Sequence, residues 1–139
     1  MRESREEFHT HTVLLGVSIK VLPFPTRHPL WPFVGVAMEA PRVLEALRHF
    51  SEPPSWDRLY KIVEIVEDDV GAIDRRGWAT KKELSRFSHT ANSPKILGRA
   101  ARHATQRVRP PKHPMDLVEA EELVKRVLVR WLQGKLPHA

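Results

Sequence analysis

Polar residues that could do phosphate chemistry are concentrated between Asn92 and Gln106. Ser93-Pro94 has the form of a helix cap followed by a first-turn proline, which predicts a helix that continues through Arg107. On such a helix, spacings of three and four residues would place these donors on one face: Lys95, Arg99, Arg102, His103 and Gln106.

A face of this kind is suited to binding a phosphate group. Asn92 adds a donor at the helix start, where free backbone N–H groups already favour an anion. An arginine can hold a phosphate in a bidentate manner, and a histidine can move the protons of a phosphodiester cleavage. We therefore predict that Asn92, Lys95 and Arg99 bind phosphate or RNA and that Arg102 and His103 are catalytic. The alternative is that Arg102 and His103 only lie on the polar side of an amphipathic helix.

These residues belong to a longer stretch, residues 75–113, which we name the basic segment. It contains eleven Lys or Arg, three His and a single acid, Glu83, so its formal charge is +10. The whole chain has a formal charge of +6, which means that the other residues are acidic on balance. A polyanion is the natural partner of such a segment, although a solvated surface that serves only solubility is the alternative.

A second polar set lies on a helix expected over residues 56–70. Tyr60, Glu64 and either Glu67 or Asp68 would share a face there, so Glu64 could offer an auxiliary polar group to the basic residues. A solvated acidic stripe is the alternative reading of the same pattern.

Neither a cofactor nor a metal site is predicted. His9 and His11 alternate, but no further ligand follows at a suitable spacing. The chain lacks a glycine-rich phosphate loop, a Gly-x-Ser-x-Gly elbow and a zinc-finger spacing, and the absence of cysteine excludes disulfides and thiolate chemistry. A chain without cysteine suits a reducing compartment, and its longest apolar stretch is too short for a membrane span, so we expect a cytoplasmic protein.

The N-terminal part is expected to be extended. Residues 12–22 are rich in β-branched side chains and alternate at Val17, Ile19 and Val21, which predicts a strand. Residues 33–38 are its candidate partner, across a Pro-rich connection.

From residue 39 onward the hydrophobic spacing becomes helical. A first helix has Pro41 in its first turn and an apolar face made of Val43, Leu44, Leu47 and Phe50. The later helices begin at residues that can cap them: Ser55, Thr80 with Glu83, Ser93 with Pro94, and Asp116 with Glu119. Gly71 and Gly134 are expected to end the second and the last helix.

Together these elements predict a mainly α protein. A four- to five-helix bundle (residues 39–139) follows a short N-terminal extended or β segment (residues 1–38). Trp56 and Trp131 should pack in the core, whereas Trp78 lies in the basic segment and could stack on a base.

Residues 56–132 resemble the HEPN superfamily of helical nucleotide-binding domains. The likeness lies in the polar-studded helix around Tyr60 and Glu64, the Arg102-His103 pair and the amphipathic closing helix that starts near Met115. Many members of that superfamily are metal-independent RNA endonucleases of toxin–antitoxin or phage-defence systems, often homodimers, while others only bind. The resemblance implies that Arg102 or Arg99 clamps the phosphate, that His103 transfers protons and that Asn92 or Glu64 assists.

The leading hypothesis is therefore a HEPN-like domain that binds RNA or a nucleotide, with metal-free RNA cleavage as the activity that the resemblance implies. A module of another class, which docks an acidic protein partner through the same basic face and has no enzymatic activity, stays open. A DNA-binding helix-turn-helix over residues 80–109 is weaker, because Pro94 and Gly98 stand where a recognition helix needs helix-forming residues.

Overall fold

The computed structural model describes residues 11–14, 17–20 and 33–136. By its contacts the chain divides into two units, Met1–Trp31 and Pro32–Ala139, and each is considered by itself. No described helix is long and apolar enough to cross a membrane.

The first unit contains two short strands, β1 (His11–Leu14) and β2 (Val17–Lys20). They pair antiparallel, with His11 opposite Lys20 and Leu14 opposite Val17. The single strand expected over residues 12–22 is thus wrong in detail, because the run pairs with itself. Gly16 lies within the run, and a glycine weakens a continuous strand. Residues 15–16 and 21–22 lie outside the described residues, as does His9.

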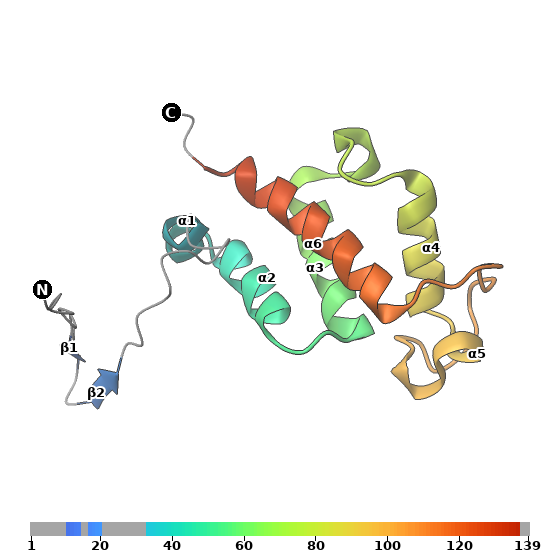
Figure 1. Cartoon of the computed structure of the whole chain (residues 1–139), viewed down its shortest axis with the longest axis horizontal. Helices are drawn as coiled ribbons and strands as arrows, with labels where there is room; N and C mark the ends of the chain where they lie inside the picture. Colours follow the sequence, from blue (N-terminus) through green and yellow to red (C-terminus); the bar gives the residue numbers. More distant parts are fainter. Residues whose placement is uncertain (1–10, 15–16, 21–32, 137–139) are drawn as a thin grey trace, which may run out of the picture. The chain divides into compact units, whose positions relative to one another are not determined.

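The second unit is a helical bundle, so the predicted helical architecture is confirmed (Figure 1). Its main helices are α1 (Val34–Glu39), α2 (Pro41–Ser51), α3 (Trp56–Val70), α4 (Lys81–Ala91), α5 (Pro94–Leu97) and α6 (Leu117–Gln133). Two short 3-10 turns, η2 (Asp74–Arg76) and η3 (Gly98–Ala100), flank α4 and α5.

Helix α3 occupies the centre of this unit and contacts α2, α4 and α6. In Figure 1, α6 runs across α3. The broad apolar face that the sequence assigns to this helix explains its position, because Ile62 and Val66 have no exposed surface. Trp56 and Trp131 are both buried, as expected, and the indole Nε1–H of Trp131 donates to Asp69 Oδ2 at 2.7 Å.

The predicted helix starts are confirmed at Ser55, Thr80 and Asp116. The Ser55 side chain accepts from the backbone N–H of Arg58, and both predicted capping boxes are complete. Each such cap satisfies backbone donors that a helix start leaves free, a contribution of about 1 kcal/mol.

The segment before α2 differs from the expectation. Residues 33–38 do not form a strand, because Val34–Glu39 is the helix α1, which packs against α2. The core face of α2 is also rotated from the predicted one: Val43 and Ala46 are fully buried, whereas Leu44 is 39% exposed. Short-range spacing defines a helical period but leaves the exact face to the neighbours that pack against it.

Candidate nucleic-acid interface

The basic segment forms η2, α4, α5, η3 and the irregular chain that leads to α6. Two of its eleven cations are half-buried, Arg86 and Arg102, and these two form ion pairs, with Glu119 and Glu64. The other cations are exposed, and none forms an ion pair with a described residue: Arg75, Arg76, Lys81, Lys82, Lys95, Arg99, Arg107, Arg109 and Lys112. The only acid of the segment, Glu83, pairs with Arg126 of α6. Most of the positive charge is therefore available at the surface.

The helix expected from Ser93 through Arg107 is not formed. Helix α5 ends at Leu97, and Gly98 then takes a φ of +56°, a conformation that glycine adopts far more readily than other residues. The chain then folds back toward the start of α5. There the Gln106 amide oxygen accepts hydrogen bonds from Ser93 Oγ at 3.0 Å and from the Lys95 N–H at 3.2 Å. The prediction that Lys95, Arg99, Arg102, His103 and Gln106 share one helix face is thus wrong.

Arg102 makes three contacts that hold it within the fold. Its guanidinium carbon lies 3.7 Å from the centroid of the Tyr60 ring, and Nη2 lies 3.4 Å from Glu64 Oε1. Its backbone N–H donates to the Ala91 carbonyl at 2.9 Å. A half-exposed ion pair and a cation–π contact each contribute about 0.5–1 kcal/mol. Arg102 thereby fastens the irregular chain to α3, and Glu64 compensates part of its charge.

Asn92 is buried rather than exposed at the surface of the basic segment. Its side chain is at the C-terminal end of α4, the residue is 5% exposed, and Nδ2 reaches Ser88 Oγ at 3.4 Å. Ser88 Oγ is also 3.3 Å from the Tyr60 hydroxyl, while Asn92 Oδ1 has no hydrogen-bond partner among the described residues. Asn92 thus belongs to a partly buried polar cluster with Ser88 and Tyr60, next to Arg102. His103 is half-buried in the irregular chain, and its side chain forms no hydrogen bond with a described residue.

Arg99 and Arg102 do line one common pocket, of about 510 Å³, together with Trp56 and Asp57 from the start of α3. Lys95 and His103 are not among its lining residues. The hydrogen bond from Lys61, and to a smaller extent the charge of Arg102, hold the pKa of the Asp57 carboxyl below its ordinary value. A carboxylate therefore faces these two arginines, which makes the pocket less favourable for an anion.

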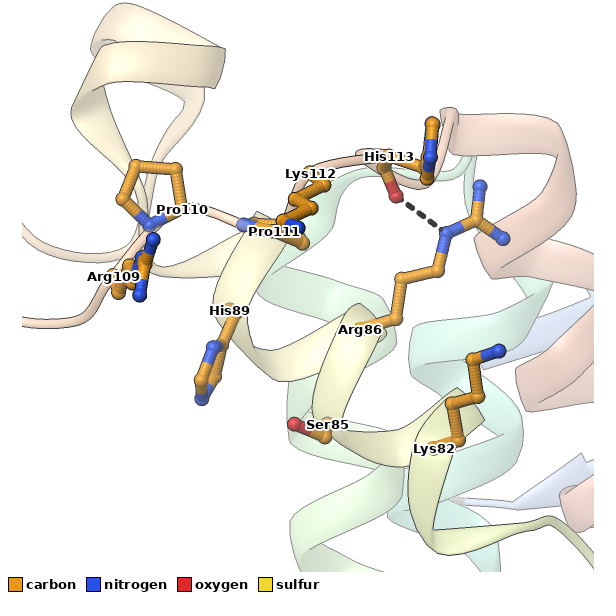
Figure 2. A pocket seen from close by; sticks show the side chains of 9 residues that line it. All are labelled: Lys82, Ser85, Arg86, His89, Arg109, Pro110, Pro111, Lys112 and His113. Carbon is orange, nitrogen blue, oxygen red and sulfur yellow. Dashed lines mark hydrogen bonds between the residues drawn. The ribbon is translucent and has the colours of Figure 1, made fainter.

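A second pocket, of about 490 Å³, was missed by the sequence analysis (Figure 2). One wall is α4, with Lys82, Ser85 and His89, and the other is the loop of residues 109–113. No acid lines it. Residues 82, 85 and 89 are spaced so that they lie on one side of a helix. This polar helix side, together with the Pro-Pro pair between basic residues in the loop, is the sequence signal that could have revealed the pocket.

Arg86 fixes the loop that forms this second pocket. Its Nε donates to the His113 carbonyl at 2.7 Å, the bond drawn in Figure 2, and Nη2 donates to the Pro114 carbonyl at 2.9 Å. The same guanidinium bonds both carboxylate oxygens of Glu119, at 3.1 and 2.9 Å. The hydrogen bond from Arg86, and then that from the Asp116 backbone, lower the pKa of Glu119. Arg86 therefore contributes little free charge to the pocket.

Within the described residues, no group of three or more His, Asp or Glu side chains is arranged to hold a metal ion. No family model matches the chain, and neither a curated protein nor a solved structure is similar enough to count as a match.

Proposed function

We propose that this protein binds RNA through the surface of its basic segment. The observation that carries the proposal is the distribution of charge: the cations of this segment are exposed and unpaired with any described residue, except for Arg86 and Arg102. Phosphate contacts by exposed Lys and Arg dominate the affinity of proteins for nucleic acids, because each contact releases condensed counterions. The resemblance of residues 56–132 to the HEPN superfamily favours RNA among the polyanions.

Binding is favoured over cleavage by the environment of the two expected catalytic residues. The Arg102 guanidinium contacts Glu64 and Tyr60, and Glu64 compensates part of its charge, so less of that charge is available to a phosphate. No described residue orients the His103 imidazole through a hydrogen bond. A general base is normally oriented by a neighbouring group, which is lacking here among the described residues.

The test is a binding titration with a fluorescent single-stranded RNA in EDTA. The variant Lys95→Gln/Arg99→Gln/Arg107→Gln removes three exposed cations of the basic segment, and its affinity should fall by about tenfold or more. The matched control Arg48→Gln/Lys125→Gln/Arg130→Gln removes three exposed cations of α2 and α6. Equal losses in the two variants would contradict a defined basic interface, and displacement of RNA by an equally charged polyglutamate would favour an acidic protein partner.

The same RNA reports on cleavage. We expect it to stay intact in EDTA with the wild-type protein. Formation of 2′,3′-cyclic phosphate ends by the wild type but not by the His103→Ala variant would overturn the binding-only proposal and assign a ribonuclease activity to His103.

A further inference from the structure

The pocket between α4 and the loop of residues 109–113 has features that the general charge of the basic segment does not explain. Three of its cations, Lys82, Arg109 and Lys112, are exposed, and none forms an ion pair with a described residue. They come from two separate elements, α4 and the loop, and line the same hollow. A pocket that gathers positive charge without any acid in its lining is suited to a phosphate group.

The rest of the lining is suited to a flat ring. Pro110 and Pro111 contribute apolar ring surfaces, and His89 contributes an aromatic ring from the second half of α4. The methylene stems of the lysines and the arginine add further apolar surface below their charged heads. Nucleobases stack on such surfaces with little regard to sequence, because every base has a π face.

The pocket is also held in shape at both ends of its loop. On one side, the Gln106 amide donates to the Val108 carbonyl while its oxygen accepts from Ser93 and Lys95. On the other side, Arg86 holds the carbonyls of His113 and Pro114. The two prolines restrict the backbone between these anchors. A preformed pocket loses less conformational entropy when a ligand binds, which favours affinity.

We propose that this pocket binds one nucleotide unit of the RNA strand. The phosphate binds to the basic lining that Lys82, Arg109 and Lys112 provide, and the base lies against Pro110, Pro111 and His89. The assignment to an RNA strand rests on the proposed function, whereas the assignment of a nucleotide to this pocket can be tested without RNA.

The experiment is an NMR titration of the ¹⁵N-labelled full chain with 5′-AMP, with inorganic phosphate and adenosine as separate probes. Shifts should be concentrated at residues 82–89 and at 109, 112 and 113. The variant Lys82→Gln/Arg109→Gln/Lys112→Gln should bind AMP at least about tenfold more weakly. The control Lys95→Gln/Arg99→Gln/Arg107→Gln loses the same charge from the same segment outside the pocket, and it should bind AMP like the wild type.

A single change separates the ring from the phosphate. His89→Ala should weaken AMP binding by several-fold and leave the binding of inorganic phosphate unchanged. If AMP and inorganic phosphate bind equally well, the pocket is a simple anion site and the nucleotide assignment is wrong. Displacement of AMP by tetraglutamate at equal concentration would likewise overturn it.

The outcomes also separate this inference from the proposed function. The pocket assignment fails, and RNA binding stands, if the wild type binds RNA but the shifts caused by AMP lie outside the pocket. The same holds if the pocket variant and the control variant lose the same amount of AMP affinity. If the wild type does not bind RNA, the proposed function fails, whereas AMP shifts confined to the pocket still support a nucleotide site.

Discussion

Two arginines of the basic segment serve the fold, and the difference from their neighbours is visible only in three dimensions. Arg86 bonds Glu119 and two carbonyl groups of the loop, and Arg102 lies between Tyr60 and Glu64. These partners are distant in sequence: His113 is 27 residues from Arg86, and Glu64 is 38 residues from Arg102. The sequence identified Glu64 as a group near the basic residues, yet it could not separate a structural arginine from a ligand-binding one, because both have the same local spacing.

Glu83 gives a residue-scale prediction about pH. The hydrogen bond from the Thr80 backbone, and then that from Arg126, lower its pKa from 4.5 to about 2. Because the folded state holds the carboxylate more strongly than the unfolded state does, this stabilisation is present above about pH 4.5 and is lost as the pH falls toward 2. Solvent screens the side chain, which is 39% exposed, so we expect its contribution to be about 1 kcal/mol.

The measurement is the free energy of unfolding in urea at several pH values between 7 and 3. Glu83→Gln should be less stable than the wild type near neutral pH and should lose less stability as the pH falls. Glu45→Gln, an exposed carboxyl of α2, serves as the control and should follow the wild type. Parallel curves for Glu83→Gln and the wild type would contradict the assignment.

At the scale of elements, the sequence predicted those helices whose first turns contain a side chain that caps them. Ser55, Thr80 and Asp116 satisfy backbone donors within their own first turns, so their effect does not depend on the rest of the fold. The region after Ser93 could not be predicted in this way. Gln106 reaches back over more than ten residues to hold the start of α5, and this contact competes with a continuous helix. Its consequence is that Lys95 and His103 lie outside the pocket of Arg99 and Arg102.

Gly98 gives the corresponding prediction. Its φ of +56° and ψ of −126° lie in a region that is costly for residues with a Cβ atom, although no atom lies within 4 Å of an added Cβ. Gly98→Ala should therefore lower the free energy of unfolding by about 1–3 kcal/mol through backbone strain alone. Gly35→Ala is the matched control, because Gly35 lies in α1 without a positive φ and also has free space around it. That change should be neutral or stabilise by up to about 1 kcal/mol.

Urea unfolding of both variants, with far-UV circular dichroism of the native states, decides the point. A stabilised Gly98→Ala variant with increased helix content would mean that the chain from Ser93 to Arg107 prefers one continuous helix. In that case the arrangement of Arg99, Arg102 and His103 on a common face would have to be considered again.

At the scale of the whole molecule, most of the positive charge belongs to the second unit, as does the core that the described residues form. The buried side chains that contact one another come from α2, α3, α4 and α6, and residues 1–31 carry a formal charge of only +1. The basic segment, by contrast, carries +10. RNA binding should therefore be a property of residues 32–139, and the first unit should contribute little to its affinity or to its dependence on salt.

A fragment of residues 32–139 tests this prediction. It should unfold cooperatively at nearly the same urea concentration as the full chain, because the packed helices are retained. For single-stranded RNA, the logarithm of the binding constant falls with the logarithm of the salt concentration by about 0.7 for each phosphate contacted. Contacts to three to five phosphates would give a slope of about −2 to −4, and the fragment and the full chain should share it. A fragment that folds but has a clearly smaller slope would place part of the RNA-binding surface in residues 1–31, and a slope near zero for both proteins would exclude an electrostatic interface.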